Sequence, residues 1–162
     1  MALSAQERLL RAREALRAAE LGSGLVHGAT EGIESREGAS GVLHVDGGRA
    51  ELVAALRSLL PEGGWAGVVG VPDLGWEAVA RAGVDLSRVL AVPDPGADPA
   101  RVCGLLLEAV DVVCVGGGLV PARSWRRLAA LARTHRRVLV ATEPWPGVSR
   151  PWRALRLAEA AS

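Results

Sequence analysis

Residues 65–118 have the sequence WAGVVGVPDLGWEAVARAGVDLSRVLAVPDPGADPARVCGLLLEAVDVVCVGGG. This stretch contains three short apolar runs, at 65–71, 88–92 and 111–115. Segments with the apolar spacing of amphipathic helices separate these runs. Short continuous apolar runs that are rich in valine are typical of strands buried on both faces. Strands that alternate with helices predict a parallel sheet, because each helix returns the chain to the edge where the previous strand began.

The same alternation continues on both sides of this stretch. Before it, an apolar run at 42–45 is followed by a helical pattern at 49–60, and after it a helical pattern at 122–135 precedes a run at 137–141. We therefore expect an α/β fold over residues 42–142, with a mostly parallel five-stranded sheet and helices on both faces.

Three further segments flank this expected core. Residues 1–24 predict an amphipathic helix, since Ser4 and Glu7 have the spacing of a capping box. Residues 25–41 are polar and glycine-rich without a period, which is typical of a linker. Residues 143–162 form a basic tail that contains proline and tryptophan.

The composition excludes several kinds of chemistry. All 19 basic residues of this 162-residue chain are arginine. Without lysine there is no P-loop lysine and no Schiff-base or pyridoxal-phosphate chemistry. Two cysteines do not make a disulfide framework. The N-terminus lacks the pattern of a signal peptide, and no apolar run is long enough to span a membrane, so we expect a cytoplasmic protein.

Charge is distributed unevenly along the chain. Residues 1–100 carry 9 arginines and 14 acidic residues, whereas residues 101–162 carry 10 arginines and 4 acidic residues. The basic part suggests an acidic partner or nucleic acid, although two solvated faces of opposite sign explain the asymmetry equally well. Arginine interleaved with tryptophan can bind phosphates and bases or form protein hot spots. The candidate partner-binding or DNA-binding residues are Arg126, Arg127, Arg150, Trp152, Arg153 and Arg156.

The carboxyl ends of the strands are where open parallel sheets bind their ligands. Four acidic residues expected there could hold Mg²⁺ and support a phosphoryl-transfer or hydrolase reaction, which is one alternative function. These residues are Asp46, Asp73, Asp94 and Glu143. Acidic residues also serve as turns and helix caps at such positions, and we favour that interpretation, so no metal site is predicted. The sequence shows no nucleophile–base pair at a recognisable spacing.

The turn after the first expected strand is the natural place for a phosphate-binding loop. Its sequence is Asp46-Gly47-Gly48-Arg49. A P-loop needs G-x-x-x-x-G-K-[ST], in which backbone N–H groups surround the phosphates and the lysine neutralises their charge. The turn here is too short and has neither the lysine nor the hydroxyl. We therefore expect no nucleotide binding of the P-loop kind.

Residues 42–142 resemble the core of RecA and its relatives. The shared motifs are a strand that ends in an acid, an A-x-x-x-G-V-D element, a strand with a final P-D, and an apolar D-V-V-x-V strand. They correspond here to Val71-Pro72-Asp73, Ala80 to Leu90, Val92-Pro93-Asp94, and Asp111 to Val115. Two features of the family's ATPase site are absent. The P-loop is degenerate at residues 46–49, and Gly116 stands where the family has its Mg²⁺-holding aspartate.

A RecA-like protein without ATPase motifs resembles the ImuA and ImuA-prime family of bacterial mutasomes, to which SulA-type division inhibitors are related. This resemblance implies a non-enzymatic accessory protein without a cofactor, which acts in SOS-induced translesion synthesis. The implied partners are an ImuB-like homologue of Y-family polymerases and an error-prone C-family polymerase, with DNA as a further candidate. The resemblance also implies self-association through the N-terminal helix, for which Leu9 and Leu16 are the candidate residues.

Overall fold

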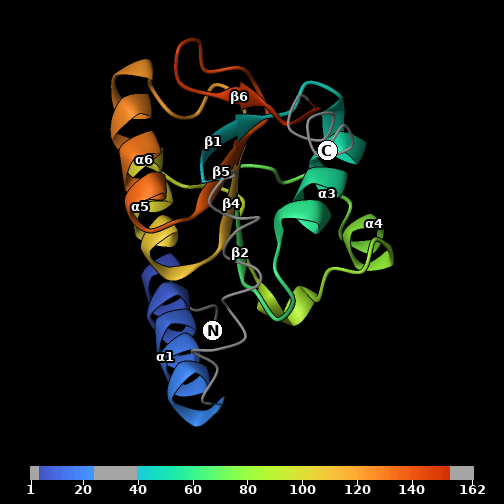
Figure 1. The fold of residues 1–162 in the computed structure, drawn as a ribbon, viewed down its shortest axis with the longest axis vertical. Helices are drawn as coiled ribbons and strands as arrows, with labels where there is room; N and C mark the ends of the chain where they lie inside the picture. Colours follow the sequence, from blue (N-terminus) through green and yellow to red (C-terminus); the bar gives the residue numbers. More distant parts are fainter. Residues whose placement is uncertain (1–3, 24–39, 154–162) are drawn as a thin grey trace, which may run out of the picture.

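The computed structural model describes residues 4–23 and 40–153, and the side chains of 4–14 and 40–153. Its centre is a six-stranded sheet with the order β3-β2-β4-β5-β1-β6, in which every neighbouring pair is parallel (Figure 1). In chain order the elements are α1 (Ala5–Ser23), β1 (Gly41–His44), α3 (Gly48–Leu59), β2 (Ala66–Val69), α4 (Trp76–Arg81), η1 (Leu86–Arg88), β3 (Val89–Val92), α5 (Pro99–Ala109), β4 (Val112–Val115), α6 (Ala122–Thr134), β5 (Val138–Ala141) and β6 (Arg150–Pro151).

The predicted α/β fold with a parallel sheet is confirmed, and each of the five expected strands is present. The sheet has one strand more than expected. In this sixth strand, β6, Arg150 lies opposite Leu43 and Pro151 lies opposite His44 of β1. A two-residue strand that contains proline leaves no strand pattern in a sequence, because proline lacks the N–H group that a ladder uses.

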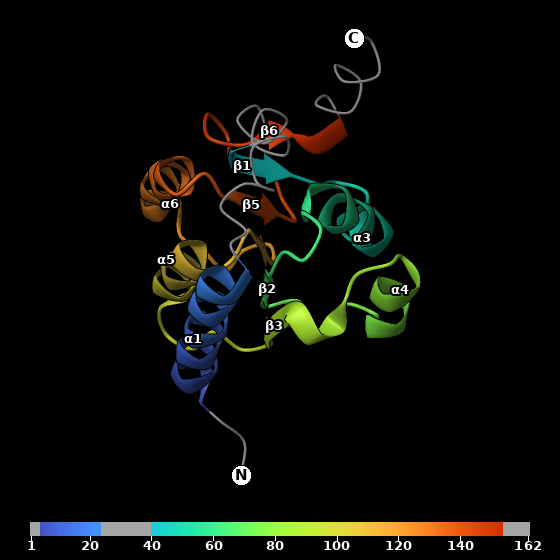
Figure 2. The same cartoon turned by 60° about the horizontal axis from the view of Figure 1, so that its bottom comes forward.

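The helices cover both faces of the sheet, as Figure 2 shows most clearly. Helices α3 and α4 lie on one face, whereas α5 and α6 lie on the other, with α1 packed outside α5 and near β3. No helix within residues 4–23 and 40–153 combines the length and the hydropathy that a membrane span requires.

Local side-chain contacts explain where two helices begin. The predicted capping box of α1 is confirmed, since the Ser4 N–H donates to Glu7 Oε2 at 2.7 Å and the Glu7 N–H donates to Ser4 Oγ at 3.2 Å. Helix α5 begins after Asp98, whose carboxylate accepts the Arg101 N–H at 3.1 Å, and has Pro99 in its first turn.

Each face of the sheet has its own apolar core, and each core contains a tryptophan from the segment after β5. Trp145 is 1% exposed and packs on the side of α5 and α6. Trp152 is 3% exposed and packs on the side of α3 and α4. Part of the tail is therefore built into the domain by the burial of two large aromatic side chains.

Candidate functional site

Because all strands are parallel, the loops that follow them meet at one edge of the sheet, here called the carboxyl edge. The turn after β1, the Gly70–Asp73 loop after β2, the Gly116–Gly118 loop after β4 and Glu143 after β5 lie at this edge. Ligands of open parallel sheets bind at such edges. The carboxyl edge is therefore the place to examine the residues of the RecA-like motifs.

The degenerate P-loop turn is occupied by a carboxylate of the chain itself. Gly47 precedes α3, and its N–H donates to the carboxylate of Glu51 in the first turn of that helix. Glu51 Oε1 also accepts the Arg153 Nε–H at 3.0 Å, and the Glu51 side chain is only 9% exposed. A helix N-terminus with free N–H groups would favour a phosphate, but here an internal anion takes that position.

The one cation of this turn is also engaged. Arg49 donates from Nε and Nη2 to Asp73 Oδ1 at 3.1 and 2.7 Å, which joins the turn after β1 to the loop after β2. The hydrogen bonds from Arg49 lower the pKa of the Asp73 carboxyl below its ordinary value. Arg49 is therefore paired with an acid of the chain.

Gly116, at the position of the family's Mg²⁺-holding aspartate, lies against the backbone of the neighbouring loop. A Cβ atom added at Gly116 would lie 2.2 Å from the carbonyl oxygen of Gly70 and 3.4 Å from Leu119 Cδ1. Leu119 also packs over Gly70 itself, where an added Cβ would lie 2.0 Å from Leu119 Cδ1. The space that an aspartate would need is thus filled by backbone and by an apolar side chain.

The four acidic residues of the alternative Mg²⁺ hypothesis have separate local roles. Glu143 Oε1 accepts the Gly118 N–H at 2.7 Å, and Asp94 Oδ1 accepts the Gly96 N–H at 2.9 Å. Asp73 binds Arg49, and Asp46 Oδ2 lies 3.8 Å from His44 Nε2. Within residues 4–23 and 40–153, no group of three or more His, Cys, Asp or Glu side chains could hold a metal ion.

The structure reveals a histidine–serine pair that the sequence did not indicate. His44 Nδ1 lies 2.8 Å from Ser149 Oγ, although 105 positions separate the two residues. The same hydroxyl oxygen accepts the Trp145 N–H at 2.7 Å. Ser149 therefore holds the turn from Trp145 and fastens it to β1, which is a positioning role. A lone polar residue in an apolar strand, His44, was the only signal of this contact.

The two cysteines are core residues. Cys103 on α5 and Cys114 on β4 are both 0% exposed. Burial raises the pKa of each thiol to about 12, so the nucleophilic thiolate is not formed at neutral pH.

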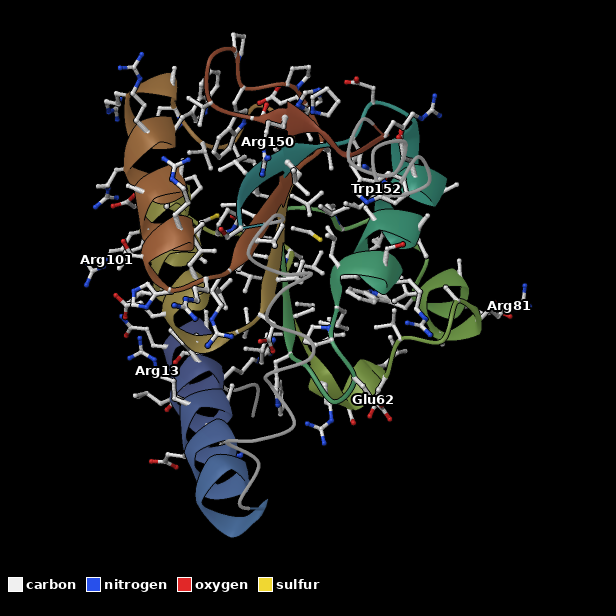
Figure 3. All side chains as sticks on the ribbon, in the orientation of Figure 1. Arg13, Glu62, Arg81, Arg101, Arg150 and Trp152 are labelled. Carbon is white, nitrogen blue, oxygen red and sulfur yellow. The ribbon has the colours of Figure 1, made fainter. Side chains whose placement is uncertain are left out.

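The structure does not gather the candidate residues of the basic region into one surface. Trp152 is buried beside α3 and does not form part of the exposed Arg/Trp surface that the sequence suggested (Figure 3). The Arg153 side chain is 75% exposed, and its Nε–H donates to Glu51 of α3. Arg150 lies on β6, away from α6, and its Nη2 donates to Ser40 O at 3.5 Å. Arg156 lies outside the described residues.

The remaining candidate residues belong to α6 and to α1. Arg126 and Arg127 are exposed on α6. Leu9, proposed for self-association, is 8% exposed and packs within the chain's own core on the side of α5, so it would be available to a neighbour only if α1 moved away. Leu16 belongs to α1, and its side chain lies outside the described part of the structure.

The fold and the carboxyl edge define a parallel α/β domain in which carboxylates of the chain itself bind the N–H group and the arginine of the turn after β1. The chain belongs to the MT3502 N-terminal domain family, whose model matches residues 30–147. It is 38% identical over 115 residues to the uncharacterized protein Rv3395c of Mycobacterium tuberculosis (strain ATCC 25618 / H37Rv), with 69% of this chain and 55% of that protein covered. The chain thus spans about half the length of this relative.

The comparison with solved structures finds SulA from Pseudomonas aeruginosa. The match covers 62% of this chain and 94% of that chain, with a TM-score of 0.46 and 17% sequence identity.

Proposed function

We propose that this protein is a non-catalytic accessory protein of SOS-induced translesion synthesis, which acts in the cytoplasm by binding other proteins and not by hydrolysing ATP. The observation that carries the proposal is the closure of the carboxyl edge at both positions of the RecA-like ATPase motifs. Glu51 takes the phosphate position of the degenerate turn, and the Gly70 carbonyl excludes a side chain at Gly116. A RecA-like domain that binds no ATP can still act by binding other proteins through its surface.

The motif resemblance to the ImuA-prime family supports the biological setting of this proposal. It names an ImuB-like homologue of Y-family polymerases as the direct partner and an error-prone C-family polymerase as a further member of the assembly. The match to the MT3502 N-terminal domain family, over residues 30–147, includes all of the 42–142 core.

The first experiment tests for the absence of a nucleotide site. Thermal unfolding of the purified protein is followed with and without ATP or ADP, each with Mg²⁺. The proposal predicts the same Tm under all conditions, because a ligand that binds only the folded state would raise it. A nucleotide-dependent rise in Tm would overturn the pseudo-ATPase part of the proposal and would favour the Mg²⁺-dependent enzyme.

The second experiment tests the assembly itself. The tagged full chain is co-expressed with the ImuB-like protein, and copurification is measured together with the damage-induced mutation frequency of a strain that lacks the chain. Copurification and a lowered mutation frequency support the proposal. Normal induced mutagenesis in the deletion strain contradicts it, whatever the protein binds.

A further inference from the structure

The N-terminal half of α6 carries a compact set of arginines that we call the α6 arginine face, formed by Arg123, Arg126 and Arg127. All three residues are exposed. The spacings 123–126 and 123–127 are i, i+3 and i, i+4, so the three side chains are neighbours on the helix surface. Helix α6 itself forms the outer margin of the domain in Figure 1.

The charges of this face are not compensated within the described chain. Helix α6 contains no acidic residue, and no hydrogen bond or ion pair joins the side chains of Arg123, Arg126 or Arg127 to the described side chains of residues 4–14 and 40–153. Six other arginines of the described residues form ion pairs with acidic side chains. The ion pairs are Arg13–Glu108, Arg49–Asp73, Arg81–Glu77, Arg88–Asp85, Arg137–Asp111 and Arg153–Glu51.

The position of these arginines on the helix is also unfavourable for the isolated domain. They occupy the first six residues of α6, where the helix dipole is positive and favours acidic side chains. The cap residue Pro121 supplies no side-chain hydrogen bond. An approaching carboxylate would therefore be attracted by the guanidinium groups and by the end of the helix together.

The helix that presents this face is held rigidly. Trp125 stacks on the buried Trp145, with ring centroids 5.2 Å apart and an angle of 4° between the planes. The Trp125 Nε1–H also donates to Val120 O at 3.0 Å, which ties the first turn of α6 to the preceding loop. Arginines on a rigid helix lose less freedom when they pair with a ligand than arginines on a mobile loop would.

The size of the face distinguishes a protein partner from nucleic acid. The affinity of a protein for a nucleic acid backbone grows with the number of phosphates that it neutralises, and this face offers only three guanidinium groups. The aromatic residue of α6, Trp125, is engaged with Trp145 and Val120, so it does not offer a free stacking platform for bases. Three guanidinium groups within two helical turns suit carboxylates at the i, i+3 and i+4 positions of a second helix, with which arginine forms bidentate pairs.

We propose that the α6 arginine face binds an acidic helical segment of a protein partner. This inference rests on the proposed function and gives the chemistry of the surface through which the assembly forms. It assigns the binding role to Arg123, Arg126 and Arg127. Trp152 is excluded because it is buried, and Arg153 is not part of this face because it pairs with Glu51 of α3 on the other side of the sheet.

The test uses charge reversal on the full chain. The probe is a fluorescein-labelled helical peptide with glutamates at i, i+3 and i+4 spacing, and its binding is followed by fluorescence anisotropy. The wild type and the R126E/R127E variant are compared with R8E/R11E, which changes the net charge equally on exposed positions of α1. We expect R126E/R127E to weaken binding by about tenfold or more, which is about 1.4 kcal/mol, and R8E/R11E to bind as the wild type does.

A charge swap makes the test specific. A peptide in which lysines replace the glutamates should bind R126E/R127E and not the wild type. Equal weakening by R8E/R11E would overturn the proposal, because the net charge alone would then explain binding. No binding of the acidic peptide would overturn it as well. Tighter binding of a DNA duplex than of the peptide, lost in R126E/R127E, would assign the face to nucleic acid instead.

The failure of this inference is distinguishable from failure of the proposed function. If the ImuB-like protein copurifies equally with the wild type and with R126E/R127E, the assembly exists but uses another surface. If it copurifies with neither, while R126E/R127E alone loses the acidic peptide, the face binds acidic helices and the proposed partner is wrong.

Discussion

The carboxyl edge of the sheet and the α6 arginine face differ in whether their charged groups are paired within the chain. At the edge, Glu51, Asp73 and Glu143 each accept hydrogen bonds from the chain itself. On α6, Arg126 and Arg127 are exposed, with no ion pair to the described residues. The comparison teaches that the residues that look most like a ligand site contribute to folding here. We therefore expect the binding surface where charged side chains have no partner among the described residues.

The largest loss of stability is expected for Trp152, which comes from the tail and packs on the side of α3 and α4. Trp152→Ala removes a side chain that is 3% exposed, and loss of a buried aromatic residue costs about 3 kcal/mol or more in the free energy of unfolding. Urea unfolding measures this loss, with Trp76→Ala, which removes a half-buried indole, as the control. Equal losses in the two variants would show that Trp152 is not part of the core.

The next largest loss of stability is expected at Gly116, where the resemblance places an aspartate. Gly116→Ala places a methyl group 2.2 Å from the Gly70 carbonyl oxygen, so the two loops must separate, and we expect a loss of about 2 kcal/mol. Gly104→Ala on α5 is the control, because its Cβ would meet only an ordinary contact of 3.5 Å. If Gly116→Ala unfolds at the same urea concentration as the wild type, the edge is open and the argument for closure fails.

A smaller effect is expected at the internal carboxylate. Glu51→Gln keeps the shape of the side chain but removes the charge that binds the Gly47 N–H and Arg153, and we expect a loss of about 1 kcal/mol. The matched variant is Glu62→Gln, which changes an exposed glutamate. A difference of the same size in both variants would mean that total charge, and not the closed turn, is responsible.

The Arg49–Asp73 pair predicts that the free energy of unfolding depends weakly on pH in the acid range. Its pKa is lower in the folded protein than the ordinary 3.8, so the ionised carboxylate stabilises the fold above that pH. This contribution is lost as the pH falls below 3.8 through the folded pKa. Asp73→Asn should therefore lower the urea midpoint at pH 6 more than at pH 3, and Arg49→Ala should show the same trend. A pH-independent difference would show that the pair does not form in solution.

The smallest effect on stability is expected on α6. Arg126→Glu combined with Arg127→Glu changes exposed side chains at a helix end that favours acids, so the free energy of unfolding should stay within about 0.5 kcal/mol of the wild type. Urea unfolding measures it in parallel with peptide binding. A large destabilisation would mean that the arginines serve the fold, and it would end the contrast with the carboxyl edge.

Most of the fold was predictable because its signals are local. The valine-rich runs, the Ser4–Glu7 capping box and the Asp98-Pro99 helix start each depend on residues within a few positions of one another. Strand β6 was not predictable, because its two residues have no pattern of their own and exist as a strand only through β1.

The candidate site was predictable only in what it lacks. The sequence shows the missing lysine and the glycine at position 116, where the resemblance places an aspartate, but no local pattern shows that the Gly70 carbonyl fills the space. Likewise, the sequence left open whether Trp152 is exposed or packs on its own domain, because the segments that cover Trp152 and bind Arg153 lie far away along the chain. These contacts join segments 46 to 102 positions apart, which short-range periodicity does not describe.

The place of β1 in the sheet has a consequence for how the chain is made. Strand β1 is synthesised before its neighbours β5 and β6, so Gly41 has no strand partner until Val138 has been added, and Leu43 has none on its other side until Arg150 has been added. At about 5–20 residues per second, a ribosome needs about 5–20 s to supply those partners. During that time Val42 and Leu43, each at most 2% exposed in the folded protein, have no ladder to join. The nascent chain must therefore carry this buried strand unpaired until β5 and β6 have been synthesised.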